Sequence, residues 1–174
     1  SLATAVVNDS TLDVSDLNDA ITQANSATGG TTTSFTIAGG ITINGGTASD
    51  FTSLLANETA SQLAITDQNL TVDDGTISVA NARALSAATT GTVTGTITSG
   101  TTIAAMVDGS SGLTETSNAY TITISSGDAE ATAANLTSLY GKTSVAVDAS
   151  AVTQITGTVA EANIVYAAGT SEIT

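Results

Sequence analysis

Carboxylates are the side chains of this sequence that could support a binding or catalytic site. The 174 residues include 16 acidic side chains but only two cations, Arg83 and Lys142, and no His or Cys. Asp73 and Asp74 precede Gly75 at a predicted turn, where carboxylate and carbonyl oxygens together could bind calcium. They are the leading candidates for a calcium site. The alternative is structural, because Asp and Gly are also ordinary turn formers.

A second group of aspartates lies near the N-terminus: Asp9, Asp13, Asp16 and Asp19. They could add calcium ligands, but Asp near a helix N-terminus also interacts favourably with the helix dipole. Paired carboxylates could serve glycoside hydrolysis. Such enzymes usually line their sugar clefts with aromatic side chains, whereas Tyr120, Tyr140 and Tyr166 fit better as packing residues. We therefore expect no enzymatic activity, and no cofactor other than calcium.

Composition argues against several further classes of function. Without His and Cys, this chain cannot form imidazole or thiolate metal sites, Ser-His-Asp or Cys-His catalytic sets, or disulfides. Its formal charge of -14 repels phosphate, so nucleic acids and anionic lipid headgroups are not expected partners. No stretch approaches the roughly 18 to 20 apolar residues of a transmembrane helix, so we expect no membrane insertion.

Clusters of aliphatic residues recur about every 25 to 31 residues, a period typical of solenoid proteins. Within each cluster, apolar and small polar residues alternate, as in a strand with one buried face. The predicted strands are Thr4–Val7, Ser34–Ala38, Gln62–Thr66, Thr92–Thr98, Ala119–Ser125 and Thr143–Asp148. The expected inward residues are Phe35, Ile37, Leu63, Ile65, Val93, Ile97, Tyr120, Ile122, Ile124, Val145 and Val147.

Each repeat is expected to continue into further elements. Several repeats have a second short strand after a turn rich in Gly, Asn or Asp: Ser10–Val14, Gly40–Asn44, Asn69–Asp73 and Ala151–Thr156. A helix with apolar residues three and four positions apart then closes each repeat. The expected helix caps are Ser15, Ser49, Ser78, Thr101, Thr132 and Thr158. Thr158 has capping-box spacing to Glu161, and the last helix is expected to end at Gly169.

These elements predict an α/β repeat fold, a right-handed parallel β/α solenoid of about six units. The single array over residues 1–174 divides approximately into 1–31, 32–60, 61–91, 92–117, 118–142 and 143–169, with 170–174 starting a further unit. The crossover from strand through helix to the next strand makes the pairing parallel. A helix-poor parallel β-helix is the alternative, because Ala, Thr and Gly make each helix weak.

Threonine supplies a second candidate surface. Thr121 and Thr123 flank inward Ile122, so stacked strands of this kind would present a flat face of hydroxyl groups. Such a face could bind ice or a glycan. The alternative is structural, because Thr favours strands and its hydroxyl is readily solvated on an exposed sheet face. In addition, Ala64 and Ala146 interrupt the expected row of outward threonines.

Two segments carry a resemblance to known repeats: Ile77–Ile97 (ISVANARALSAATTGTVTGTI) and Ala133–Thr156 (AANLTSLYGKTSVAVDASAVTQIT). They resemble repeats of giant secreted or cell-surface proteins of marine cyanobacteria and other marine bacteria. The shared pattern is an Ala- and Leu-containing helix followed by a Thr- and Val-rich strand, and it covers roughly the C-terminal half of the chain. The resemblance implies type I-style export and an adhesive or surface-layer role without a catalytic site.

We therefore expect a structural or adhesive segment of an extracellular, bacterial cell-surface protein. The alternative is a binding module that uses the Thr-rich face or the acidic turns for a glycan, ice or calcium. Ser1–Val7 and Gly169–Thr174 both resemble strand starts, and the chain does not begin with Met. We expect it to be processed or part of a longer array, or to self-associate end to end into a filament, fibre or surface layer.

Overall fold

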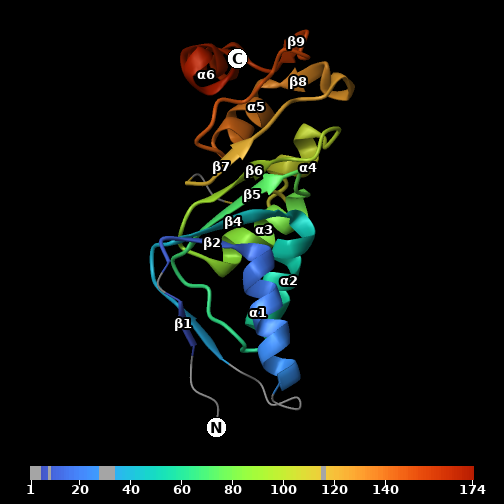
Figure 1. Cartoon of the computed structure of the whole chain (residues 1–174). Coiled ribbons are helices and arrows are strands. Elements are labelled where there is room, and N and C mark those ends of the chain that lie inside the picture. The colour runs from blue at the N-terminus through green and yellow to red at the C-terminus, as the bar shows by residue number, and fades with distance from the viewer. Residues whose placement is uncertain (1–4, 8, 28–33, 115–116) are drawn as a thin grey trace. The chain divides into compact units, whose positions relative to one another are not determined.

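The computed structural model describes residues 5–7, 9–27, 34–114 and 117–174. The chain divides into two compact units, which comprise residues 1–75 with 84–93 and residues 76–83 with 94–174. Short strands and helices alternate along each unit (Figure 1). We describe the first as the N-terminal unit and the second as the C-terminal unit.

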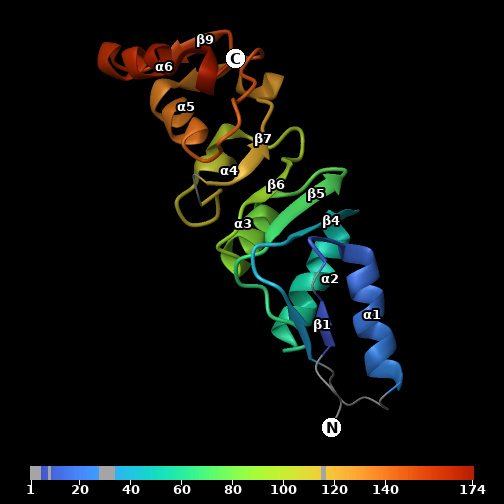
Figure 2. The ribbon, with the colours of Figure 1, turned by 60° about the vertical axis from the view of Figure 1, so that its left-hand side comes forward.

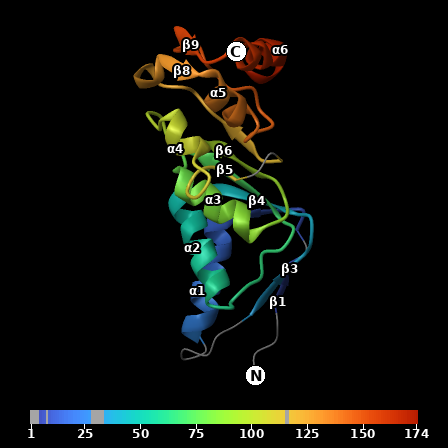
Figure 3. The same cartoon turned by 180° about the vertical axis from the view of Figure 1, so that it is seen from behind.

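The N-terminal unit contains five strands and two helices among its described residues. They are β1 (Ala5–Val7), β2 (Thr11–Asp13), α1 (Val14–Ala27), β3 (Phe35–Ile37), β4 (Thr42–Thr47), α2 (Ala48–Thr59) and β5 (Asn69–Asp74). Helices α1 and α2 pack side by side (Figures 1 and 3). Both helices also contact β4, so one helical layer covers this part of the sheet.

The C-terminal unit combines three-residue strands with helices of different lengths. They are α4 (Ile103–Val107), β7 (Ala119–Thr121), the 3-10 turn η1 (Ser126–Asp128), β8 (Glu130–Thr132), α5 (Ala133–Tyr140), β9 (Gln154–Thr156) and α6 (Val159–Glu172). Helix α5 contacts both α4 and α6 (Figure 2). Two elements, α3 (Val79–Ala88) and β6 (Val93–Thr96), have residues in both units.

The structure confirms a mixed α/β fold with a parallel sheet. Five of the described strands belong to one sheet in the order β2-β4-β5-β6-β7. Strands β2–β4, β4–β5 and β6–β7 pair in parallel, as do β1–β3 and β8–β9 in two smaller sheets. With six α-helices among the described residues, the helix-poor alternative does not describe this chain. The division into six repeats between 1–31 and 143–169 stays a prediction.

Parallel pairing recurs at similar sequence distances in both units. Thr11 of β2 lies opposite Thr42 of β4, which lies opposite Asn69 of β5. In the C-terminal unit, Thr94 lies opposite Ala119. Neighbouring strands are therefore about 25 to 31 residues apart in sequence, the interval at which the aliphatic clusters recur.

The predicted inward positions form the core with one exception. Phe35, Ile37, Leu63, Ile65, Val93, Ile97, Tyr120, Ile122, Ile124 and Val147 are all at most 9% exposed. Val145 is 37% exposed, so its assignment to the core was wrong. The N–H of Val145 donates to the Thr143 hydroxyl at 3.1 Å, and this local turn interrupts the alternation expected for an extended strand.

A local turn also replaces most of the strand predicted at Gln62–Thr66. Only Leu63 bridges to Phe35 of β3. The side-chain carbonyl of Gln68 accepts hydrogen bonds from the N–H groups of Thr66, at 2.7 Å, and Asp67, at 3.3 Å. These two N–H groups therefore donate to a side chain and do not take part in a strand ladder.

Side-chain caps start the helices as predicted, although three cap residues differ. Ser78, Thr132 and Thr158 accept the expected backbone hydrogen bonds, and Thr158 forms the capping box with Glu161. The caps of α1, α2 and α4 are Asp13, Thr47 and Thr102, and the predictions of Ser15, Ser49 and Thr101 were wrong by one or two positions. Gly169 interrupts α6 at φ 57°, close to the predicted helix end.

Two buried threonines join neighbouring strand segments through the same hydrogen bonds. The Thr89 hydroxyl donates to the Gln68 carbonyl at 2.6 Å and accepts the Gly91 N–H at 2.9 Å. The Thr143 hydroxyl donates to the Tyr120 carbonyl at 2.7 Å and accepts the Val145 N–H. We call residues 89–91 and 143–145 the threonine turns.

Candidate functional site

The predicted calcium residues lie at the end of β5. Asp73 and Asp74 are both exposed, and the Gly45 N–H of β4 donates to Asp73 Oδ2 at 3.3 Å. Successive side chains of a strand point to opposite faces, so this pair alone does not converge on one ion. The carboxylate of Asp13 lies on Gly45, where a side chain would collide with it.

Within the described part of the chain, no three Asp or Glu side chains are grouped so that they could hold a metal ion. The calcium site at Asp73 and Asp74 stays a prediction. Several other carboxylates instead cap helices or turns. Asp13 Oδ1 accepts the Ser15 hydroxyl at 2.6 Å and the Ser15 N–H at 2.8 Å, and Asp50 forms a capping box with Thr47.

Capping hydrogen bonds lower the pKa of the carboxylates that accept them. The hydroxyl and N–H of Ser15 lower the pKa of Asp13, and those of Thr47 lower the pKa of Asp50. The pKa of Asp108 is lowered furthest, by the Ser110 hydroxyl and the Ser111 N–H above all. Backbone and hydroxyl donors of Ser150 and Thr158 lower the pKa values of Asp148 and Glu161. These carboxylates are thus ionised parts of the backbone scaffold at neutral pH.

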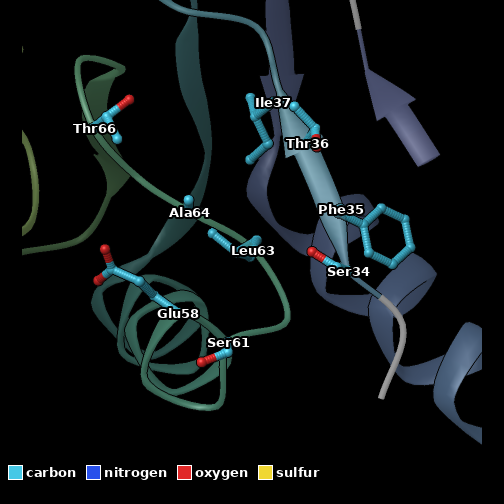
Figure 4. Close-up of a pocket in the computed structure, with 9 residues that line it drawn as sticks. All are labelled: Ser34, Phe35, Thr36, Ile37, Glu58, Ser61, Leu63, Ala64 and Thr66. Atoms are coloured by element: carbon cyan, nitrogen blue, oxygen red, sulfur yellow. The ribbon is translucent and has the colours of Figure 1, made fainter. Parts of the chain in front are cut away.

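A groove of about 550 Å³ lies between β3 and the segment after α2 (Figure 4). Phe35, Thr36 and Ile37 border it on the side of β3, and Leu63 and Ala64 border it on the other. Its polar lining residues are Ser34, Thr36, Glu58, Ser61 and Thr66. The groove offers hydroxyl groups and one carboxylate, a set that suits a neutral hydroxylated ligand better than an anion.

Several large apolar side chains of α6 are exposed. Among the side chains that the structure describes, the exposed large hydrophobic ones all lie between residues 145 and 166. Val159 is 79% exposed, Tyr166 75% and Ile164 49%, and Ile155 of β9 is 37% exposed. Tyr166 was expected to be a packing residue, and within this chain that prediction was wrong. Val159 and Tyr166 are seven residues apart and therefore lie on one side of α6, and exposed apolar side chains that share a surface are typical of interaction sites.

In helix α5, the positions that correspond to Val159 and Tyr166 are not exposed. Counted from the capping threonine, Ala133 of α5 corresponds to Val159 of α6, and Tyr140 corresponds to Tyr166. Ala133 is fully buried and Tyr140 is half-buried in the unit where α6 packs on α5. Their counterparts are exposed because the described residues include no helix that packs on the far side of α6.

Threonine hydroxyls line part of the exposed sheet surface. Thr96 lies opposite Thr121 in the pairing of β6 with β7, and both are exposed. Beside them, the hydroxyls of Thr76 and Thr98 are 3.3 Å apart. The C-terminal unit therefore carries a small Thr-rich face of the kind that the alternation predicted.

The fold and surfaces define a mixed α/β protein with parallel, laterally paired strands. No family model matches the sequence, and no curated protein or solved structure matches it either. The described helices include none with the length and apolar character needed to cross a bilayer.

Reasoning from the sequence missed the exposed face of α6, although the signal was present. Val159, Ile164, Val165 and Tyr166, with four alanines among residues 160–168, place apolar side chains around most of the circumference of the helix. A helix that is apolar on all sides requires cover on all sides. Val165, which is 7% exposed, faces the side that is covered here.

Proposed function

We propose that the chain is a structural or adhesive repeat segment of an extracellular bacterial surface protein. In this proposal the repeats form a right-handed parallel β/α solenoid of about six units, within a longer or self-associated array. The main support is the recurrence of parallel pairing at nearly constant sequence distance, from β1–β3 to β8–β9. Repeats of this size cannot bury their own apolar faces and must stack on neighbours.

The polar groups of the chain support the same interpretation. Buried Thr89 and Thr143 bond to carbonyls of the preceding strand segment, and Asp13, Asp50 and Glu161 cap helices. The two threonines therefore hold one segment of chain on another, and the three carboxylates fix the starts of helices. Chemistry on a substrate would require polar groups that are not already engaged in this way.

Antibody labelling of intact cells tests the location and role. An antibody raised against the purified chain should label the surface of unpermeabilised producing cells in electron micrographs, in continuous or fibrous patches. Protease added to intact cells should remove the label. Label that requires permeabilisation would contradict the proposal.

Hydrogen exchange tests the stacked architecture separately. An Ile122→Asp substitution places a carboxylate in the core, where its cost is several kcal/mol. In a stacked array, the neighbouring segments at Ile97 and Val147 should lose protection together with Ile122 itself. Loss restricted to residues next to Ile122 would argue against stacking.

A second candidate function is binding of ice or a glycan by the Thr-rich face. The in-register pair Thr96 and Thr121 favours it, because regular hydroxyl spacing suits an ordered, neutral surface. The double substitution Thr96→Lys and Thr121→Lys should abolish any thermal hysteresis or any binding to insoluble polysaccharide. Thr52→Lys and Thr59→Lys on the exposed surface of α2 provide the matched control. Absence of both activities in the unsubstituted chain would exclude this candidate.

A further inference from the structure

We propose that Asn44 is a site of spontaneous covalent modification, at which the side-chain amide is lost and an aspartate or isoaspartate residue forms. The backbone nitrogen of Gly45 carries out the reaction, and water is the only co-reactant. The carboxylate of Asp73 assists by accepting the proton of that nitrogen. This inference goes beyond the proposed function and does not depend on it.

The Asn44-Gly45 pair is the only Asn-Gly sequence in the chain. Loss of an asparagine amide begins when the backbone nitrogen of the next residue attacks the side-chain carbon Cγ and closes a five-membered ring. A side chain on that next residue hinders the attack, whereas Gly has no Cβ and the widest conformational freedom. Every other asparagine of the sequence is followed by a residue with a side chain. Residue type alone therefore singles out Asn44.

The structure places this pair in a bulge of β4. The register with β5 advances from Leu70 to Val72 while β4 advances from Ile43 to Gly46, so β4 contains one extra residue. Within the bulge, Gly45 has φ 76°, in the left-handed region, and is not extended. In a regular strand the ladder holds the backbone extended and resists the rotation that ring closure requires. A bulge interrupts the ladder, so this restraint is weakest at the bond that reacts.

A carboxylate lies at the attacking nitrogen. The N–H of Gly45 donates a hydrogen bond to Asp73 Oδ2 at 3.3 Å. A general base must be within hydrogen-bond reach of the proton that it removes, and such bonds are often long before the reaction begins. Asp73 is exposed, so the proton can pass from its carboxylate to water or to the leaving group.

The amide of Asn44 is also free to turn toward this nitrogen. Hydrogen bonds hold the side chains of several other asparagines. Asn57 Nδ2 donates to Asn18 Oδ1 at 2.9 Å, and Asn69 Oδ1 accepts the Thr92 N–H at 2.9 Å. The side chain of Asn44 makes no such bond to any residue that the structure describes. It is half-buried, so water reaches the site.

The reaction takes place in two steps. In the first, the Gly45 nitrogen bonds to Asn44 Cγ, the bond from Cγ to the amide nitrogen breaks, and ammonia leaves with the proton that the Gly45 nitrogen has lost. In the second, water opens the resulting cyclic imide. Attack at Cγ yields aspartate with the backbone unchanged, and attack at the backbone carbonyl yields isoaspartate. The net change is the replacement of an amide group by a carboxyl group.

The product would weaken the pairing of β4. Asp13 of β2 lies opposite Asn44, and its carboxylate already lies against Gly45. A new carboxylate at position 44 would add one negative charge beside Asp13 and Asp73, in a chain with a formal charge of -14. Like charges directly opposite each other destabilise a strand pair. Isoaspartate would in addition lengthen the backbone of β4, which pairs with β2 on one side and β5 on the other.

Incubation of the purified chain at neutral pH in water enriched in heavy oxygen, followed by peptide mass spectrometry, tests the proposal. The peptide that contains Asn44 should gain one heavy oxygen atom as its amide is replaced. It should react at least about tenfold faster than any other asparagine peptide, which corresponds to a barrier lower by about 1.4 kcal/mol. Electron-transfer fragmentation distinguishes the isoaspartate product from aspartate.

An Asp73→Ala substitution tests the role of the carboxylate. Without this base, the folded chain should modify Asn44 about tenfold more slowly, a conservative figure for general-base catalysis. Asp74→Ala is the matched control, because it removes the same charge from the neighbouring exposed residue. In urea, where Asp73 is no longer held at Gly45, the two variants should react at the same rate.

Two substitutions at position 44 test the consequence. Asn44→Gln lengthens the side chain and prevents closure of the five-membered ring, so its melting temperature should stay constant during the incubation. The melting temperature of the unsubstituted chain should fall as modification proceeds. Asn44→Asp reproduces the charge of the product and should melt below Asn44→Gln from the start.

Other results would overturn the inference. If the folded chain kept Asn44 intact while the urea-unfolded chain lost the amide, the bulge would protect the site and not promote its reaction. Equal rates for Asp73→Ala and Asp74→Ala in the folded chain would contradict the role of Asp73. Conversion of another asparagine as fast as Asn44 would show that the bulge and the glycine confer no selectivity.

Discussion

The two threonine turns make the same hydrogen bonds in different units but differ at their third residue. Each buried hydroxyl donates to a carbonyl of the preceding strand segment and accepts the N–H two residues further on. The third residue is Gly91 in one turn and Val145 in the other. A side chain at Gly91 would collide with the backbone carbonyl of Gln68, whereas the Val145 side chain is 37% exposed.

This difference separates two roles within one turn. The hydroxyl bonds fix where a segment attaches to its predecessor, and the third residue sets how closely the backbones approach. After Gly91 the chain enters β6. Directly after Val145, the chain forms isolated bridges at Val147 and Asp148 in place of a strand. Glycine is required in the first turn because a Cβ there would collide with the backbone carbonyl groups of Asp67 and Gln68, directly before β5 begins.

The largest effect is expected from Gly91→Ala. The added methyl group collides with backbone, which cannot rotate away, so the free energy of unfolding should fall by about 3 kcal/mol or more. Urea denaturation measures this change. Gly109→Ala is the matched control, because no atom lies within 4 Å of its Cβ position. Equal stability of the two variants would show that the close approach at Gly91 is unimportant.

Removal of the hydroxyl should have the next largest effect, and a similar one in both turns. Thr89→Val and Thr143→Val each leave a buried carbonyl and an N–H without their partner, at a cost of about 1 to 3 kcal/mol. Thr121→Val, on the exposed surface of β7, should change stability by less than about 0.5 kcal/mol. If only one turn responded, the two would not be equivalent.

Acid should weaken the helix caps while the threonine turns, which do not titrate, keep their bonds. The folded pKa values of Asp13, Asp50 and Glu161 lie below the ordinary carboxyl value of about 4, so the caps stabilise the fold above that pH. That stability is lost as pH falls through the lowered values. The melting temperature should therefore drop below about pH 4, and Asp13→Asn should flatten this dependence.

The smallest effect is expected from Val145→Thr. Because the side chain is exposed and β-branched in both cases, the free energy of unfolding should change by less than about 0.5 kcal/mol. Calorimetry of this variant beside Thr143→Val tests whether the turn depends on its hydroxyl alone. A loss above 1 kcal/mol (roughly twice the expected limit) would place Val145 in the core after all.

Much of the fold followed from local pattern. Alternation placed Phe35, Ile122 and Val147 in the core, and capping chemistry identified Ser78, Thr132 and Thr158. Local pattern was misleading where a side chain competed with the backbone, as Gln68 does near Leu63 and Thr143 does at Val145. In both cases the same side chain also donates to the carbonyl of a distant residue, Gln68 to Ala38 and Thr143 to Tyr120, and spacing in the sequence does not encode such bonds.

The candidate surfaces were less predictable. The acidic turn at Asp73 and Asp74 was visible as a cluster of charges, but whether carboxylates converge depends on strand register and on neighbours such as Gly45. The exposed face of α6 was hidden for the opposite reason. Apolar residues such as Val159 and Tyr166 indicate burial, and only packed coordinates show which side of a helix has a partner.

The sequence by itself determined the alternation of short strands and capped helices, the parallel direction of pairing, and the exclusion of His- or Cys-based chemistry. These depend on residue type and local spacing, which act over a few residues. Tertiary structure alone decided which segments approach through Thr89 and Thr143, and which face of α6 is uncovered. Those features depend on contacts between residues more than twenty positions apart, and the free energy of such contacts is set by packing and not by local propensity.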